Sequence, residues 1–179
     1  METVRKANIA DINQMSSIHA KAWKLAYKGM IPQNFLDNLA EDFWVDSFNK
    51  NFQENLSEAL VYEIDGQITG CITFGKARIP ASCKGDSACR NECSSCGEIY
   101  SLYVDPDHWD TKQGYLLTKA ALNELVGLGY TRTYLWVLSS NKRGIDFYKR
   151  FGFSYNNESA IFTLQGMNLE EKRFIIKLI

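Results

Sequence analysis

Four cysteines lie within fourteen residues of this chain, close enough together to hold a metal ion or to form disulfides. Two of them have the Cys-x-x-Cys spacing that lets consecutive thiolates reach one tetrahedral zinc ion. The other spacings differ from those of a standard zinc ribbon, so a thiol–disulfide switch and a loop with incidental cysteines remain alternatives to zinc binding. The candidate metal ligands are Cys83, Cys89, Cys93 and Cys96.

The segment that carries these cysteines, at about residues 77–97, is polar and shows no hydrophobic periodicity. An irregular segment of this length inside a compact domain is usually functional or mobile. We therefore expect a Cys-rich insertion in a single domain that spans residues 1–179. The fifth cysteine, Cys71, belongs to a strand-like run and is expected to be an ordinary buried residue.

A second group of polar side chains lies between residues 98 and 153. Glu98 starts a strand-like run, and its carboxylate is a candidate proton acceptor. Tyr148 lies in a Phe-Tyr-x-x-x-Gly-Phe segment, where its phenol is a candidate proton donor. Asn141 precedes Tyr148 by seven residues and could bind a ligand. The structural alternatives are a strand-end carboxylate in solvent, a half-buried aromatic ring and a helix cap, respectively.

Hydrophobic periodicity predicts the elements that must position these groups. Helices are expected between Asn8 and Gly29 and at residues 34–39, 41–52, 116–128 and 144–150. Strands are expected from residue 4 and at 59–64, 68–74, 98–104, 134–138, 153–164 and 174–179, with Asp65 and Gly66 forming a tight hairpin turn. This order predicts one mixed α/β sheet of six or seven strands covered by helices. The strands at 98–104 and 134–138 should be parallel, because a helix connects them.

The order of strand, Pro106, glycine-bearing turn, helix, asparagine-bearing strand end and Phe-Tyr-x-x-x-Gly-Phe helix resembles the GNAT superfamily of acetyl-CoA-dependent N-acetyltransferases. The resemblance implies that the strands at 98–104 and 134–138 splay apart around acetyl-CoA. It also implies that backbone groups of Leu102, Tyr103 and Val104 hold the pantetheine arm of this cosubstrate.

The family's phosphate-binding turn reads Arg/Gln-x-x-Gly-x-Gly/Ala, and its glycines let backbone N–H groups approach the pyrophosphate at a helix start. In this chain the turn falls on Trp109, Asp110, Thr111, Lys112, Gln113 and Gly114. Only the last glycine is kept. Trp109 replaces the basic or amide residue and Lys112 replaces the first glycine, although the Lys112 ammonium could itself meet the phosphate.

The resemblance also assigns roles to the polar side chains. Glu98 would be the general base, which the reaction needs because an alkyl amine is mostly ammonium at neutral pH. Tyr148 would protonate the departing thiolate, and Asn141 would hydrogen-bond the CoA arm. On a regular strand Glu98 shares one face with Leu102 and Val104. Trp23, Tyr27 and His19 resemble helix residues near the acceptor site of other members, but aromatic residues at this spacing are more often core.

Composition narrows the possible partners and location. A net charge of -1 gives no electrostatic footprint for nucleic acid or an anionic membrane. No apolar run approaches the roughly 20 residues that span a bilayer, and no apolar run follows the charges of residues 1–6 as in a signal peptide. We therefore expect a cytoplasmic protein with reduced cysteines. The resemblance adds a homodimer as an expected state, because dimers are frequent in the family.

The leading hypothesis is an N-acetyltransferase that moves an acetyl group from acetyl-CoA to a small-molecule or peptide amine by direct attack in a ternary complex. The alternative is a catalytically weak acyl-CoA-binding or metal- or redox-sensing protein on the same scaffold. The altered turn favours the alternative, whereas Glu98, Asn141 and Tyr148 favour the enzyme. Polyamine, antibiotic, amino acid, peptide N-terminus and protein lysine all remain open as the acceptor.

Overall fold

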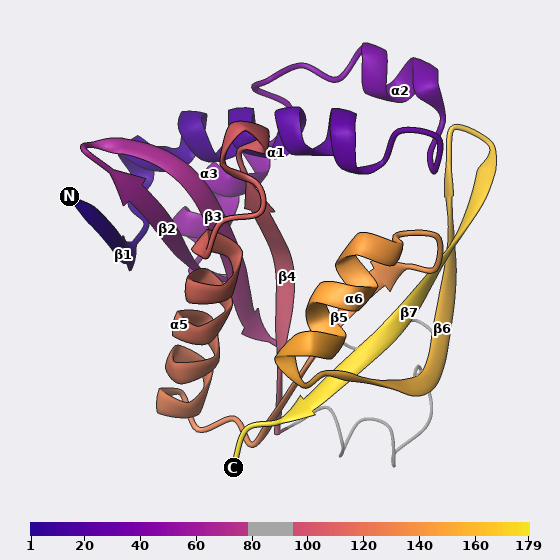
Figure 1. The fold of residues 1–179 in the computed structure, drawn as a ribbon. Coiled ribbons are helices and arrows are strands. Elements are labelled where there is room, and N and C mark those ends of the chain that lie inside the picture. The colour runs from indigo at the N-terminus through magenta and orange to yellow at the C-terminus, as the bar shows by residue number, and fades with distance from the viewer. Residues whose placement is uncertain (79–94) are drawn as a thin grey trace.

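The computed structural model describes residues 1–78 and 95–179, and within them seven strands form one mixed sheet (Figure 1). The sheet order is β1-β2-β3-β4-β5-β7-β6, and all neighbours are antiparallel except β4 and β5. The predicted mixed sheet and its parallel strand pair are therefore confirmed. The strands are β1 (Glu2–Lys6), β2 (Glu58–Ile64), β3 (Gln67–Lys76), β4 (Cys96–Val104), β5 (Arg132–Leu138), β6 (Ser154–Leu164) and β7 (Met167–Lys177).

Helices cover both faces of this sheet. The helices α5 (Gln113–Gly127) and α6 (Lys142–Phe151) pack on the face that carries Ile72, Ile99 and Leu135. On the other face, α1 (Ile12–Ala26) and α3 (Val45–Gln53) pack against Val61 and Cys71. The short helix α2 (Gln33–Asp37) follows α1, and Figure 1 shows it beside the tip of the β6–β7 hairpin. None of the helices in the described residues is long and apolar enough to cross a membrane.

Two strands separate at the centre of the sheet, as expected. β4 and β5 pair only from Cys96–Arg132 to Ile99–Leu135. Beyond this point β4 continues beside β3 as far as Val104, and β5 continues beside β7 as far as Leu138. No strand of the described residues therefore pairs with the facing backbone edges of the second halves of β4 and β5, a geometry that an added extended ligand can occupy.

A β-bulge in β4 marks the start of this separation. Thr73 of β3 pairs with Ser101, but the next residue, Phe74, pairs with Ile99, so Tyr100 is an extra residue. Such an insertion reverses the alternation of side chains along the strand. Ile99 consequently packs in the same core as Leu102 and Val104. The prediction that Glu98 shares their face is therefore wrong, because a regular strand was assumed.

The last strand is longer than its sequence pattern predicted. We expected a strand at 174–179, whereas β7 begins at Met167, directly after a turn in which Gln165 and Gly166 both have positive φ. The first half of β7 is polar and exposed on one face, so it lacks the apolar run on which the prediction depended.

The expected Cys-rich insertion at about 77–97 is narrower in the structure. Cys96 and Gly97 belong to β4, and the Ala77 N–H donates to the Cys96 carbonyl at 3.1 Å.

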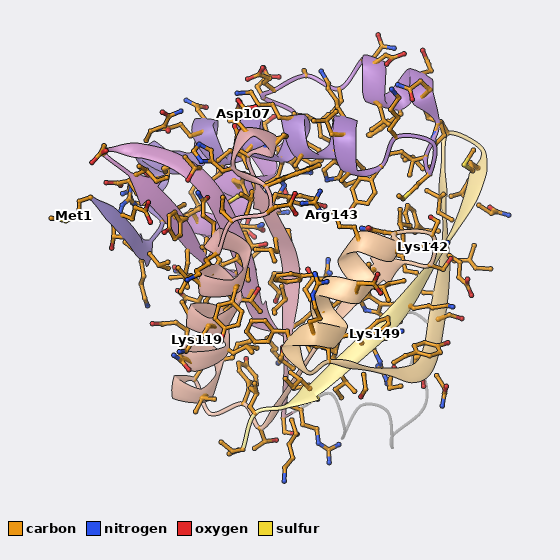
Figure 2. All side chains as sticks on the ribbon, viewed as in Figure 1. Met1, Asp107, Lys119, Lys142, Arg143 and Lys149 are labelled. Carbon is orange, nitrogen blue, oxygen red and sulfur yellow. The ribbon has the colours of Figure 1, made fainter. Side chains whose placement is uncertain are left out.

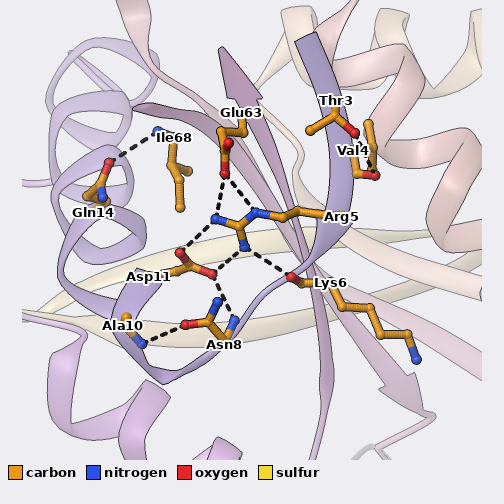
Figure 3. A network of polar contacts seen from close by, with 10 residues as sticks. All are labelled: Thr3, Val4, Arg5, Lys6, Asn8, Ala10, Asp11, Gln14, Glu63 and Ile68. Atoms are coloured by element: carbon orange, nitrogen blue, oxygen red, sulfur yellow. Dashed lines mark hydrogen bonds and ion pairs between the residues drawn. The ribbon is translucent and has the colours of Figure 1, made fainter. Parts of the chain in front are cut away.

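An ion-pair network ties the amino-terminal strand to the start of α1 (Figure 3). The Arg5 guanidinium donates to both carboxylate oxygens of Asp11, at 2.7 and 3.0 Å, and to Glu63 of β2 at 2.7 Å. Asp11 also accepts from the Asn8 N–H at 2.8 Å, and Asn8 caps the 3₁₀ turn η1 (Ile9–Asp11). The hydrogen bonds from Arg5 lower the pKa of Asp11, although burial opposes this effect. The network fixes where α1 begins over the sheet.

Candidate active site

A cavity of about 440 Å³ lies where β4 and β5 separate. Its walls come from α1, the second half of β4, the turn after β4, the second half of β5, α6 and one residue of β7. Most of the residues that the sequence predicts for acetyl-CoA line this cavity: Leu102, Tyr103, Val104, Trp109, Asp110, Thr111, Gly114, Asn141 and Tyr148. The positions of Lys112, Gln113 and Glu98 differ and are described below.

The turn at 109–114 accommodates its unusual residues without strain at Lys112. Lys112 precedes α5 with φ −80° and ψ −2°, so this position does not require a glycine. Asp110 instead has a positive φ of 60°. The Trp109 indole donates to the Val104 carbonyl at 2.8 Å, which ties the turn to the end of β4. The side chain of Gln113 is buried and accepts from the Thr69 hydroxyl at 2.9 Å, so it supports the fold.

A cation from α6 reaches this turn. The Arg143 guanidinium lies 4.3 Å from the centroid of the Trp109 ring, and its Nη2 is 3.0 Å from Asp110 Oδ1. Figure 2 shows Arg143 at the end of α6 that faces the turn. Sequence reasoning missed Arg143, because its position in α6 gives no sign that it reaches the turn after β4. The arrangement brings a positive charge to a turn that lacks the basic or amide residue of the family pattern.

The helix α6 positions two of the predicted residues. Asn141 caps the helix, and its Oδ1 accepts from the Gly144 N–H at 2.9 Å, as its structural alternative predicted. It also lines the cavity, so the cap and a ligand contact are compatible. Two turns along the helix, Tyr148 packs against Phe153 and also lines the cavity. Burial raises the pKa of Tyr148, so this phenol keeps its proton at neutral pH.

Glu98 is buried beneath an arginine and does not line the cavity. Its side chain is 1% exposed. The Arg78 backbone N–H donates to one of its carboxylate oxygens at 2.8 Å, and the Arg78 guanidinium forms an ion pair with the same carboxylate. The Arg78 guanidinium also lies 4.7 Å from the centroid of the Tyr100 ring. The carboxylate of Glu98 therefore already has charged and neutral donors within hydrogen-bond distance.

The end of α1 and its capping residue Tyr27 form another wall of the cavity. Tyr27 lines the cavity, and its hydroxyl is 3.1 Å from that of Tyr103. Trp23 packs beside it in a cluster with Ile31 and Leu36, as expected for a core residue. His19 is buried against the rings of Tyr103, Phe48 and Trp44, and burial lowers its pKa to about 3. His19 is therefore a neutral core residue in this structure.

One carboxylate of the cavity was not predicted. Glu171 of β7 lines the cavity, opposite Leu138 of β5 in the strand register. Burial raises the pKa of Glu171, Arg78 lowers it and Glu98 raises it further. The possible turn at Gln165 and Gly166, followed by Met167 and Leu169 two residues apart, is the only signal for the start of this strand in the sequence.

The described residues give no support to the predicted zinc site. Cys83, Cys89 and Cys93 lie outside them, and Cys96 is buried in β4 beside Tyr134. Within residues 1–78 and 95–179, no group of three or more His, Cys, Asp or Glu side chains could hold a metal ion. Cys71 is buried, as expected, and burial raises the pKa of its thiol.

Comparisons with known proteins agree with this geometry. The model of the Acetyltransferase (GNAT) family matches residues 22–153, and the chain therefore belongs to this family of acetyltransferases. An uncharacterized N-acetyltransferase of Bacillus subtilis strain 168, YuaI, is 23% identical over 171 residues, which are 96% of this chain and 90% of the relative. Mycothiol acetyltransferase of Mycobacteroides abscessus is 40% identical, but over only 32% of this chain and 20% of its own length.

Solved structures share the whole fold at low sequence identity. An N-acetyltransferase from Staphylococcus aureus Mu50 has a TM-score of 0.72 at 20% identity and covers 100% of this chain and 99% of its own. The PaiA N-acetyltransferase of Thermoplasma acidophilum, in complex with coenzyme A, has a TM-score of 0.71 at 20% identity with 99% of both chains covered. YncA of Salmonella typhimurium, with acetyl-CoA, has a TM-score of 0.70 at 20% identity and covers 99% of this chain and 94% of its own.

Proposed function

We propose that this protein transfers an acetyl group from acetyl-CoA to a primary amine by direct attack within a ternary complex. The observation that carries the proposal is the cavity between the separated strands, lined on one side by the unpaired edge of β4 and on another by Tyr148. Family membership supports acetyl transfer. The coenzyme A and acetyl-CoA in the T. acidophilum and S. typhimurium structures support the cosubstrate.

The residues of the cavity fit acetyl-CoA. Backbone groups of Leu102, Tyr103 and Val104 would hold the pantetheine arm as an added strand does, because β5 does not pair with them. The pyrophosphate would lie at the turn 109–114, where the first N–H groups of the fifteen-residue helix α5 are available to an anion. Arg143 would supply the charge of the basic residue that Trp109 replaces, and Asn141 would contact the arm.

Tyr148 is proposed to protonate the thiolate as the thioester breaks. Its phenol is held protonated by burial and lines the cavity in which the sulfur would lie. Glu98, the base that the family resemblance implies, stays a candidate. Because Glu98 does not line the cavity, a proton from the amine would have to pass the ion-paired Arg78 to reach its carboxylate.

Calorimetric titration with acetyl-CoA, followed by a thiol-release assay with primary amines, tests the proposal. We expect one acetyl-CoA site per chain with a Kd in the usual micromolar range and release of CoA that depends on the amine. Acetyl-CoA binding without amine-dependent release of CoA would favour the acyl-CoA-binding alternative, which the altered turn also favours. Absence of acetyl-CoA binding would contradict both functions.

A further inference from the structure

Apart from the Asp110–Arg143 ion pair, the cations and the carboxylate of the cavity lining come from different elements. The cations of the cavity lining, Arg143 and Arg150, both come from α6, and Arg143 lies beside the turn where the phosphates of acetyl-CoA would lie. Asp110 is at the same end and is paired with Arg143. Glu171 is the other carboxylate of the cavity lining and comes from β7. The cations thus come from the α6 side of the cavity, and Glu171 comes from its β7 side.

Glu171 lies on the face of the sheet away from α6. In β7 it alternates with Leu169 and Arg173, which therefore share its face. Leu169 packs with Leu138 against Ile31 and Leu36, the residues that follow α1. Arg173 lies over the Tyr134 and Trp136 rings. The segment around α2 and the β6–β7 hairpin, which lie side by side in Figure 1, therefore flank Glu171.

Glu171 and Glu98 differ in what occupies their carboxylates. Arg78 holds Glu98 through its backbone N–H and its guanidinium. Within residues 1–78 and 95–179, Glu171 forms neither an ion pair nor a side-chain hydrogen bond, although it is only partly exposed. A partly buried carboxylate without a donor is ready to receive a cation from a ligand.

We propose that Glu171 binds the ammonium group of the acceptor and takes the proton that this group must lose before it attacks the thioester. The proposal rests on the N-acetyltransferase function proposed above. Tyr27, Trp136 and Leu138 line the same cavity, so the acceptor class is a primary alkyl amine whose adjoining carbons contact aromatic and apolar side chains. Partial burial also raises the pKa of Glu171; the charge of Arg78 opposes this shift and the charge of Glu98 adds to it. Because its pKa is raised, Glu171 is a stronger base than an exposed glutamate.

The protons balance in this arrangement. The ammonium nitrogen gives one proton to Glu171, and its lone pair forms the C–N bond to the acetyl carbonyl carbon. The C–S bond breaks, its electron pair goes to sulfur, and the Tyr148 phenol protonates the thiolate. The nitrogen loses a second proton as the amide forms, and this proton restores the phenol. The proton on Glu171 passes to solvent before the next turnover.

Glu171→Gln tests the proposal, with Glu170→Gln as the matched control. Glu170 is the adjacent residue of β7, is exposed and points to the opposite face. Acetyl-CoA turnover is measured as CoA release with butylamine, cadaverine, spermidine and a peptide with a free N-terminus. We expect Glu171→Gln to lower kcat/KM at neutral pH by about 100-fold or more, with acetyl-CoA affinity unchanged. Glu170→Gln should match the wild type.

The pH profile separates a base from a merely structural glutamate. For the wild type, kcat/KM should rise with pH through the pKa of Glu171, whereas the Gln variant should recover activity only as the free amine deprotonates in solution. Equal rates for wild type and Glu171→Gln would overturn the proposal. A loss of kcat/KM in Glu171→Gln that is the same at every pH would also overturn it. If Glu98→Gln, and not Glu171→Gln, removes the rise of kcat/KM with pH, the base is Glu98.

A binding measurement keeps the proposal testable if none of the four amines is acetylated. NMR chemical-shift changes on titrating CoA-loaded protein with butylammonium are compared with those caused by butanol, which has the same chain without the charge. We expect shifts with butylammonium in the wild type and in Glu170→Gln, and their loss in Glu171→Gln. Equal shifts in all three proteins, or none in the wild type, would refute the ammonium site. Failure of the proposed function is recognised separately, by lack of acetyl-CoA binding or by acetyl-CoA binding without amine-dependent release of CoA.

Discussion

Single residues determine whether the turn at 109–114 can hold the pyrophosphate of acetyl-CoA, as proposed above. Lys112 replaces a glycine at a backbone conformation that any residue adopts, so its cost is small. Trp109 replaces a basic residue but holds Arg143 over its ring, and Asp110 pairs with the same guanidinium. At the Trp109 position, a charge of the turn itself has therefore been exchanged for one supplied by α6.

The first prediction concerns this arginine. Arg143→Gln should weaken acetyl-CoA binding by about tenfold, because it removes a charge-assisted contact and leaves Asp110 unpaired beside the pyrophosphate. Calorimetric titration at low salt measures the loss, and Lys142→Gln is the control from the same turn of α6. Adding Asp110→Asn to Arg143→Gln should recover part of the affinity. An affinity for Arg143→Gln equal to that of the control would place the pyrophosphate elsewhere.

Tyr148 gives a second prediction at the scale of one hydroxyl. Tyr148→Phe should lower kcat by about 100-fold while acetyl-CoA affinity stays the same, because the phenol acts only as thiolate charge develops. Steady-state rates and calorimetry together separate the two effects. Tyr155→Phe, which alters an exposed tyrosine of β6, serves as the control. A full rate for Tyr148→Phe would remove this phenol from the mechanism.

Helices and strands position these residues around the cavity, and the ion pairs of Arg5 fix the position of the helix α1. Asp11 joins β1 to α1, the helix whose Tyr27 lines the cavity. Because the pKa of Asp11 is lowered in the fold, its pairing stabilises the protein above the pKa of an unfolded aspartate. This stability is lost as the pH falls through the lowered value.

The third prediction follows from the lowered pKa of Asp11. Asp11→Asn should reduce the free energy of unfolding by about 1 to 3 kcal/mol at neutral pH, with the difference from the wild type shrinking in acid below pH of about 4. Urea unfolding at several pH values measures this, and Asp42→Asn, at an exposed residue, is the control. A difference that grows in acid would show that Asp11 is not the ionised partner of Arg5.

At the scale of the whole molecule, the cavity exists because the sheet holds together on both sides of the separated strands. β3 supports β4 and β7 supports β5, so the gap between β4 and β5 costs little beyond their unpaired edges.

Because acetyl-CoA should bind only the folded protein, acetyl-CoA at 1,000 times its Kd should stabilise the fold by about 4 kcal/mol. Hydrogen exchange should slow chiefly in the second half of β4, the turn at 109–114 and the start of α6. Protection confined to α1 and α3 would contradict the site.

The sequence predicted much of this arrangement, and its failures have physical causes. The parallel pairing of β4 and β5 follows from the helix that connects them, and Asn141 and Tyr148 lie in the strongly patterned helix α6. The bulge at Tyr100 leaves no local signal, because it depends on how β3 pairs with β4. Glu171 was missed because the first half of β7 is stabilised by its partners β5 and β6 rather than by an apolar run of its own.

The most direct test of the proposed acetyl transfer is mass-spectrometric detection of acetylated amine after incubation with acetyl-CoA and the four primary amines. We expect the wild-type protein to form an acetylated amine together with an equal amount of free CoA. The Tyr148→Phe and Glu171→Gln double variant should form it at least about 100-fold more slowly. A wild-type protein that binds acetyl-CoA but yields no acetylated amine, or a double variant as fast as the wild type, would contradict the proposed mechanism.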